Sequence, residues 1–260
     1  MRKVVIIHLH YLETIGELLK YAHTINPDLL LVTYTKNDES IRQIQDEFQN
    51  VKYYHVENRG RDIYPLLFLS KLGYFEQDSV VWKLHSKKSL NLIRGHKWFK
   101  ELCDAIAKDS SRVDAVGKLF SDTNIAMVGA NKYLKKIARK TIDEHAHLYH
   151  DWSNQLKYSH TFTHAKYISG TIFVTRSFVL DQLKYLVLKK DDFYLEDLGV
   201  KFTKWFAVKL YVFNWLKKYG IFPGLSNKLD KSTRPASQVT YALEAYLGYV
   251  ASHFGEIRGI

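Results

Sequence analysis

The sequence predicts an α/β fold in which a mostly parallel central sheet is flanked by helices and followed by a helical C-terminal part. Two observations favour this class. Short apolar runs rich in β-branched residues alternate with segments of helical length, and these runs are apolar on both faces. Strands of that kind belong to a parallel sheet covered by helices on each side. The 260 residues, 46% of them hydrophobic, suit one domain with a substantial core.

The first third of the chain predicts repeated strand–helix units. We expect strands at 4–11, 28–35, 51–58 and 78–86, separated by helices at 13–25, 39–48 and 63–73. Each crossover between parallel strands is expected to be right-handed.

The rest of the chain predicts fewer strands and more helix. Expected elements are a helical region at 96–122, a fifth strand at 124–131, a strand, turn and helix at 167–183, and helices at 201–219 and 238–254. The segment 132–165 has no clear period, and we assign it no element. No internal repeat is visible.

Charge and cysteine content narrow the function classes. Lys and Arg exceed Asp and Glu by 38 − 27 = 11, which favours anionic partners such as phosphates, nucleotides or an acidic membrane face. The single cysteine, Cys103, excludes an intramolecular disulfide and is expected to be buried in a helix. Because no run reaches the length of a membrane span and no secretory leader is recognisable, we expect a cytoplasmic protein.

Polar side chains follow three of the expected strands. They are His8, His10 and Tyr11 after the first, Asn58, Arg59, Gly60, Arg61 and Asp62 after the third, and Lys83, His85, Ser86, Lys87 and Lys88 at the end of the fourth. In an open α/β sheet, ligands bind at the carboxyl ends of the strands. We therefore expect these residues to form one basic site for phosphate and sugar hydroxyl groups.

The Asn58–Asp62 segment leaves a strand and enters a helix. Gly60 permits a positive φ or a close approach of the backbone to a ligand. Arg61 offers a planar fork for a diphosphate, and Asp62 can accept from a hydroxyl group. The alternative is structural: Asp62 as a helix N-cap with Arg61 as its surface partner.

The segment from Lys83 to Lys88 is basic where many nucleotide-sugar enzymes have an acidic pair that holds a divalent cation. Fixed cations can neutralise a departing nucleoside diphosphate as a metal ion would. A solvated basic loop is the alternative.

Four blocks, HLHY, VENRGRDIYPLL, VVWKLHSKKS and SGTIFV, resemble the rhamnan synthesis protein F family over about residues 4–183. TYALEAYLGYV, within 238–250, resembles that family's late Ala-x-Glu helix, although Ala245 stands where the family usually has Arg. The segment 189–235 matches poorly.

This resemblance implies a GT-A-like nucleotide-sugar fold and a bacterial glycosyltransferase of polysaccharide assembly. The donor would be a nucleotide-activated rhamnose or related sugar, and the acceptor a glycan linked to undecaprenyl. We expect one domain over 1–260, with a nucleotide-sugar-binding half at 1–125 and an acceptor-side half at 126–260. We expect no cofactor and no metal ion.

Inverting glycosyl transfer needs a carboxylate that takes the proton of the acceptor hydroxyl. The resemblance makes Glu244 the first candidate, and Glu196 with Asp197 is the second, by analogy with acidic pairs in other GT-A enzymes. Gly170 and Thr171, in the SGTIFV block, are the candidate acceptor-binding residues. A solvated or capping role is the alternative for each acid.

Two further features of the sequence are candidate sites. His160 and His164 have helical spacing, but HTFTH lacks the carboxylate of a zinc motif, so we expect no zinc. The segment 201–219 mixes aromatic residues with lysines and, with the basic stretch 132–140, predicts contact with an anionic membrane, or else a core helix over the acceptor side.

Two rival functions remain open on the sequence. A basic nucleic-acid-binding domain would explain the net charge, but no recognisable motif of that class is present, and we expect no nucleic-acid partner. The second rival is a non-catalytic subunit that binds nucleotide or glycan in a polysaccharide assembly complex.

Overall fold

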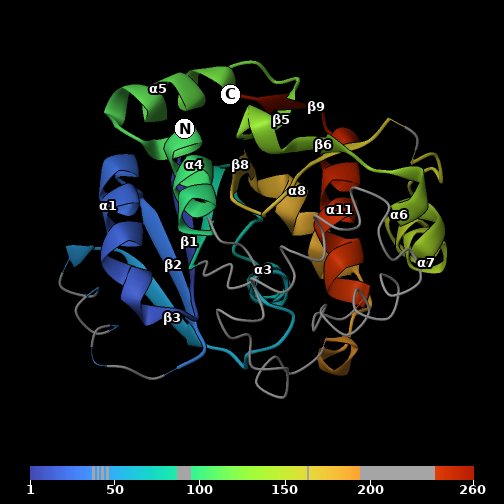
Figure 1. Cartoon of the computed structure of the whole chain (residues 1–260), viewed down its shortest axis with the longest axis horizontal. Helices are drawn as coiled ribbons and strands as arrows, with labels where there is room; N and C mark the ends of the chain where they lie inside the picture. The colour runs from blue at the N-terminus through green and yellow to red at the C-terminus, as the bar shows by residue number, and fades with distance from the viewer. Residues whose placement is uncertain are drawn as a thin grey trace, which may run out of the picture.

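A seven-stranded mixed sheet forms the centre of the computed structural model, which describes residues 1–36, 39, 41, 44, 47–86, 95–162, 164–193 and 238–260 (Figure 1). The strand order is β3-β2-β1-β4-β8-β5-β9. The strands are β1 (Lys3–Leu9), β2 (Leu29–Tyr34), β3 (Val51–His55), β4 (Val80–His85), β5 (Ile125–Gly129), β8 (Phe173–Arg176) and β9 (Glu256–Gly259). The predicted α/β class with a mostly parallel sheet is therefore confirmed.

Only β8 runs against its neighbours among the described strands of this sheet. It pairs antiparallel with both β4 and β5, while β1–β2, β1–β4, β2–β3 and β5–β9 are parallel. Lys83 near the end of β4 lies opposite Phe173 at the start of β8. The turn that precedes β8 therefore lies at the edge where β1 and β4 end.

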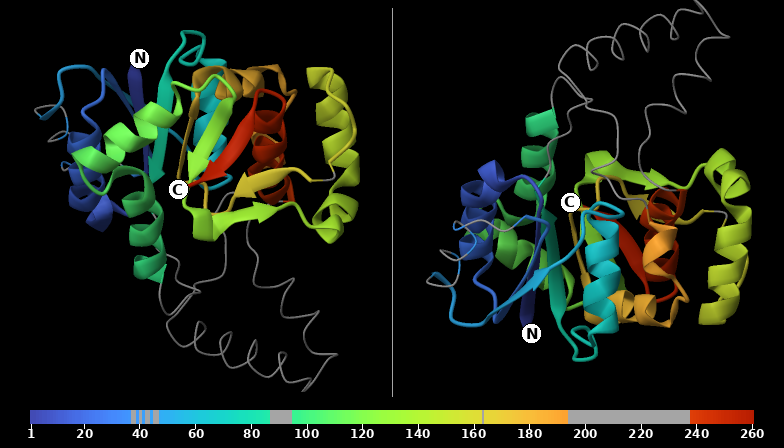
Figure 2. Two further views of the ribbon diagram at one scale, coloured as in Figure 1. Left: turned by 90° about the horizontal axis from the view of Figure 1, so that it is seen from above. Right: turned by 90° about the horizontal axis from the view of Figure 1, so that it is seen from below.

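Helices cover both faces of the sheet (Figure 2). One face carries α1 (Ile15–Ile25), α4 (Gly95–Ala107) and α5 (Ser110–Leu119); the other carries α3 (Ile63–Lys71), α7 (Ala146–Leu156), α8 (Ser177–Asp181) and α11 (Gln238–Ser252). Shorter elements are η1 (Leu12–Thr14), η2 (Asn131–Tyr133), η3 (Gln182–Tyr185), η4 (Lys190–Asp192) and α6 (Arg139–Glu144), together with a two-stranded sheet of β6 (Leu134–Lys136) and β7 (Lys166–Ile168).

The alternation of side chains in β1 explains why the sheet has two cores. Val5 and Ile7 pack with α1 and α4, whereas Val4 and Ile6 pack with α3 and α11. All four side chains are buried. The doubly apolar strand pattern in the sequence is thus the direct cause of the three-layer arrangement.

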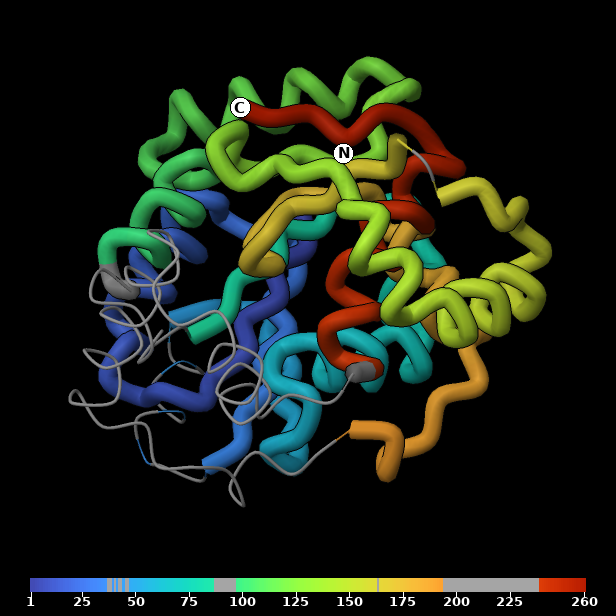
Figure 3. Tube along the Cα trace, turned by 45° about the vertical axis from the view of Figure 1, so that its right-hand side comes forward, coloured from blue at the N-terminus to red at the C-terminus, as the bar shows by residue number. Residues whose placement is uncertain are grey.

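Several elements differ from the sequence-based expectation. The last residues form β9, a strand that no expectation included, which pairs with β5 (Figure 3). The unassigned segment 132–165 contains η2, β6, α6 and α7. The expected helix at 201–219 and half of the residues of that at 39–48 lie outside the described residues. Cys103 is buried on α4, as expected.

Within the described residues, no helix is long and apolar enough to cross a lipid bilayer. The sheet takes strands from both halves of the chain, since β1 to β4 come from the first and β8 and β9 from the second. Both halves therefore contribute to the edge where the parallel strands end.

Candidate functional site

Polar side chains gather at the carboxyl ends of β1 and β4, on the face covered by α3. His8 pairs with His85 in the register of the two strands, and Lys83 pairs with Ile6. Because side chains alternate along a strand, His8, Lys83 and His85 point to the same face as Ile6. His8, Lys83 and His85 are all buried. This polar group interrupts the apolar core where the sheet ends.

The strand order places this group at a topological switch point of the sheet. The chain proceeds from β1 outward to β2 and β3, and then returns to add β4 on the other side of β1. In open α/β sheets, ligands bind outside the carboxyl ends of the two central strands at such a point. Ser86 Oγ bridges them by accepting from the backbone N–H groups of His10 (2.7 Å) and Tyr11 (3.0 Å).

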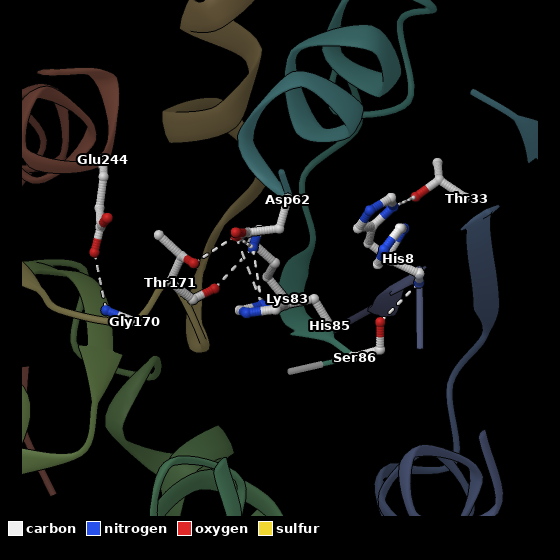
Figure 4. Close-up of polar contacts among 10 residues, drawn as sticks. His8, Thr33, Asp62, Lys83, His85, Ser86, Gly170, Thr171 and Glu244 are labelled. Carbon is white, nitrogen blue, oxygen red and sulfur yellow. Dashed lines mark hydrogen bonds and ion pairs between the residues drawn. The ribbon is translucent and has the colours of Figure 1, made fainter. Parts of the chain in front are cut away.

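Asp62 is the centre of a buried charge network (Figure 4). Its Oδ2 accepts from Lys83 Nζ at 2.5 Å and from the hydroxyl group of Thr171. Lys83 Nζ also donates to the Thr171 carbonyl oxygen (2.8 Å), and His85 Nδ1 lies 3.4 Å from Nζ and 3.6 Å from Oδ2. We call Asp62, Lys83, His85 and Thr171 the Asp62 cluster.

The charges of this cluster are mutually dependent. The Lys83 side chain is 1% exposed, and its burial lowers the pKa of its ammonium group. The carboxylates of Asp62 and Glu244 act in the opposite direction and raise that pKa. A lysine in such a place keeps its charge only through these acids, because burial without a counter-ion favours the neutral amine.

The turn before α3 adopts an unusual backbone. Gly60 (φ +53°) and Arg61 (φ +54°) are both left-handed. A Cβ atom on Gly60 would lie 2.4 Å from Phe193 Cδ1, so both space and conformation require glycine there. Asp62 directly precedes α3, but its side chain makes no helix-capping hydrogen bond. Asp62 thus occupies the N-cap position without capping the helix through its side chain, and its carboxylate faces the cluster instead.

The turn before β8 repeats this pattern. Gly170 (φ +98°) and Thr171 (φ +55°) are again consecutive left-handed residues, and a β-branched residue in that region is an outlier. Backbone strain of this kind costs about 1–3 kcal/mol and concentrates at functional sites. Here it orients Thr171 so that its carbonyl oxygen accepts from Lys83 and its hydroxyl group donates to Asp62.

Glu244 approaches this turn from α11. Its Oε1 accepts from the backbone N–H of Gly170 at 2.9 Å. Gly248 follows one helical turn later, and a Cβ there would lie 2.1 Å from the Lys166 carbonyl oxygen. Glycine therefore allows α11 to approach β7 closely. That approach brings Glu244 to the turn of Ser169, Gly170 and Thr171 before β8, which we call the SGT turn.

The segments of the site up to Thr171 are far apart in the sequence and match one family model. A model described as "Rhamnan synthesis protein F" matches residues 1–218. The chain belongs to the rhamnan synthesis protein F family. Membership connects it with the synthesis of rhamnan, a polysaccharide. The match includes the strand ends and turns of the site, whereas Glu244 lies beyond residue 218.

Two curated relatives are similar over about half of the chain. Both are named "Uncharacterized protein WxcX" and come from Xanthomonas campestris pv. campestris, strains ATCC 33913 and B100. They are 33% identical over 129 and 120 residues, which are 48% and 45% of this chain but 18% and 17% of theirs. The chain thus matches less than a fifth of the length of these relatives. No solved structure matches the chain significantly.

The expected site residues at the end of β1 have polar or aromatic neighbours. His8 Nδ1 is 3.0 Å from Thr33 Oγ1, and His10 Nδ1 is 2.8 Å from Thr35 Oγ1. Burial lowers the pKa of His8 to about 3, so its imidazole is neutral at pH 7. The Tyr11 ring lies edge-on to His10, with centroids 4.7 Å apart.

The remaining residues of the NRGRD block divide into two groups. Arg59 supports the turn, because it donates to Glu57 (2.6 Å) and to the Phe193 carbonyl oxygen (3.0 Å). Asn58 is half-buried beside it. Arg61 is exposed, and its guanidinium lies 5.4 Å from the centre of the Tyr241 ring on α11. The block thus reaches the helix that carries Glu244.

Four expected site residues lie outside the described part of the chain. They are Lys87 and Lys88 of the KLHSKKS block and the second pair of base candidates, Glu196 and Asp197. The structure therefore brings together Glu244, Gly170, Thr171 and the donor-side residues up to Ser86.

The described residues include no group of three or more His, Cys, Asp and Glu side chains that could hold a metal ion. His160, one of the two histidines weighed for zinc, has His150 Nδ1 at 2.9 Å and Asn154 Oδ1 at 2.9 Å from its ring nitrogens.

Three supporting residues were missed by the sequence reasoning. Thr33 and Phe193 make contacts that depend on strand register and chain folding, and nothing local indicates them. Gly248 had a signal, since a glycine four residues after the candidate base lies on the same face of the helix.

Proposed function

We propose that the chain is a glycosyltransferase that moves rhamnose or a related sugar from a nucleotide-sugar donor to a growing, lipid-linked bacterial polysaccharide. One observation carries this proposal. The Asp62 cluster and Glu244 meet at the switch-point edge from segments around residues 60, 84, 170 and 244. Family membership supports the polysaccharide as the product.

The donor is assigned to the crevice between the ends of β1 and β4. Its diphosphate would lie near the basic strand ends, with the exposed Arg61 guanidinium on the α3 side. Asp62 would accept from a hydroxyl group of the sugar or ribose. The Asp62 cluster holds that carboxylate in one orientation.

The transfer step follows from the position of Glu244. The acceptor hydroxyl oxygen attacks C1 of the donor sugar, and its proton passes to the Glu244 carboxylate. The bond between C1 and the diphosphate oxygen breaks, and its electron pair leaves with the nucleoside diphosphate. The Gly170 N–H holds one carboxylate oxygen of Glu244 and so orients the other. Attack opposite to the leaving group inverts C1.

Metal independence is part of this proposal. Lys83 lies near the end of β4, where an acidic pair would bind a cation, and its ammonium group, whose pKa the Asp62 carboxylate raises, would supply positive charge there without metal binding. A nucleoside diphosphate would stabilise the protein by RT ln(1 + [L]/Kd) equally with and without a chelator.

A transfer assay tests the function. Nucleotide-activated rhamnose and a rhamnose oligosaccharide are incubated with the protein in EDTA, and mass spectrometry detects a product one sugar longer. Glu244→Gln is expected to slow transfer by about 10²–10⁴-fold. The control Glu256→Gln, at an exposed ion pair with Arg258, should leave the rate unchanged. Absence of product with every nucleotide, or equal rates for both variants, would contradict the proposal.

A further inference from the structure

A hollow lies beside the SGT turn. It has a volume of about 130 Å³ and is lined by Lys97, Trp98, Glu101, Lys132 and Tyr133. These side chains come from the first turns of α4 and from η2, which follows the carboxyl end of β5. The Trp98 and Tyr133 rings lie with their centroids 5.9 Å apart and their planes 50° apart. We call this feature the Trp98 hollow.

The Trp98 hollow is connected directly to Glu244. A Cβ atom on Gly170 would lie 3.0 Å from Trp98 Cζ2, so the indole packs on the backbone of that glycine. The Tyr133 carbonyl oxygen accepts from the Ser169 N–H at 2.9 Å. Gly170 in turn donates to Glu244. One short turn therefore separates the two aromatic rings from the candidate base.

The polar groups of the hollow suit a neutral, hydroxyl-rich ligand. Glu101 Oε2 accepts from Lys132 Nζ (2.7 Å) and from the Tyr133 hydroxyl group, and these hydrogen bonds lower the pKa of the carboxyl group. Oε1 has no hydrogen-bond partner among the described residues, and the Glu101 side chain is 29% exposed. The Glu101 carboxylate, a hydrogen-bond acceptor, therefore lies beside Lys97 and Lys132, whose ammonium groups are hydrogen-bond donors.

The size of the hollow favours a sugar over a nucleotide. Pockets for drug-sized ligands measure about 300–1,000 Å³, and a water molecule occupies about 30 Å³ of liquid. A hollow of about 130 Å³ therefore has room for part of a single ring rather than for a base, ribose and diphosphate.

We propose that the Trp98 hollow binds a sugar ring of the acceptor glycan, next to the ring whose hydroxyl group is glycosylated. This inference rests on the proposed function for the role of the bound glycan. The C–H face of a pyranose packs on the negative face of the Trp98 ring. Its hydroxyl groups donate to Glu101 and accept from Lys97 and Lys132, which fixes the acceptor beside Glu244.

Glycan binding without nucleotide tests the inference separately from catalysis. A trisaccharide of rhamnose is titrated into wild-type protein, Trp98→Ala, Trp98→Phe and Glu101→Gln, and binding is followed by calorimetry and ligand-observed NMR. We expect the dissociation constant to rise about tenfold in Trp98→Ala and about fivefold in Glu101→Gln, with Trp98→Phe close to wild type. Tyr185→Ala, at an exposed tyrosine on η3, is the matched control and should bind normally.

Nucleoside diphosphate binding is measured on the same variants. Loss of glycan binding with unchanged nucleotide binding supports an acceptor subsite, even if no transfer activity is ever found. Parallel loss of both would assign the hollow to the donor and overturn the inference. Equal glycan binding by all variants, or none by wild type at millimolar concentration, would overturn it too. Glu101→Gln, at a partly exposed side chain, keeps the test valid if Trp98→Ala fails to fold.

Discussion

Lys83 and Arg176 are buried cations on the neighbouring strands β4 and β8, and they lie at opposite ends of these strands. We call these two ends of the sheet the Lys83 edge and the Arg176 edge. The two residues are 1% and 6% exposed. Among the described residues, Arg176 donates only to backbone carbonyl oxygens: those of Ile125 (2.9 Å), Phe120 (2.8 Å) and Asp122 (2.9 Å). Lys83 instead contacts a carboxylate, a histidine and a carbonyl group in a left-handed turn.

We propose that this difference separates a cation used by the fold from one that serves a ligand site. The partners of Arg176 close the segment between α5 and β5, and Phe120 is the C-cap of α5, where a positive charge is favourable. The partners of Lys83 are side chains and turns that can also meet a ligand. A hollow of about 350 Å³ adjoins Arg176, so volume alone does not locate the site.

The largest expected effect is on stability, at the Arg176 edge. Arg176→Leu leaves three carbonyl groups without their donor, and we expect the free energy of unfolding to fall by about 3–5 kcal/mol. Transfer per folded molecule should stay within twofold of wild type. Urea unfolding and a rate assay measure the two quantities. An inactive but fully stable variant would erase the distinction between the edges.

Lys83→Met should give the opposite result. Removing the ammonium group frees the Asp62 carboxylate from its orientation and removes positive potential from the crevice, and we expect transfer to slow about 100-fold. The free energy of unfolding should change by only about 1–2 kcal/mol, because Asp62 keeps the Thr171 hydroxyl group and some solvent contact.

A double variant sharpens this prediction. Because Lys83 and Asp62 act as a unit, Lys83→Met with Asp62→Asn should be no slower than the worse single variant. Rates that multiply would show that the two residues act independently.

His8 tests whether burial at the Lys83 edge keeps nearby groups neutral. The pKa of His8 is about 3 in the folded protein and 6.5 in the unfolded chain. Between pH 6.5 and pH 3 the unfolded chain therefore carries a proton on His8 that the folded protein does not. The free energy of unfolding falls as the pH drops through this range. The His8 contribution should make the protein about 2 kcal/mol less stable at pH 5 than at pH 7. His8→Gln should reduce the measured difference by that amount. An unchanged pH dependence would refute the assignment.

The smallest changes in rate and stability are expected at two threonines near opposite ends of β8. Thr171→Val keeps the volume and the β-branch but removes the hydroxyl donor to Asp62, and we expect transfer to slow about tenfold with little loss of stability. Thr175→Val removes a donor to the Ala126 carbonyl oxygen (2.8 Å) and should cost about 1–2 kcal/mol of stability without slowing transfer. Reversed effects would place the functional edge at Arg176.

The sequence predicted the sheet well because its strands are apolar on both faces, and it predicted that the polar ends of β1 and β4 lie together because parallel strands share one carboxyl edge. It did not predict that Lys83 would be buried against Asp62, since that pairing depends on the distance between β4 and the start of α3. The reversal of β8 was equally hidden, because nothing in a strand of four residues, FVTR, indicates the direction in which it runs. That reversal places Thr171 beside Lys83.

The most direct test of the account maps a nucleoside diphosphate onto the two edges by backbone amide chemical shifts of the labelled protein in EDTA. The account predicts that shifts concentrate at His10, Tyr11, Gly60, Arg61 and Ser86 and leave the surroundings of Arg176 unchanged. Shifts confined to Thr123, Ser177 and their neighbours at the Arg176 edge, or saturable binding that appears only with a divalent cation, would contradict it.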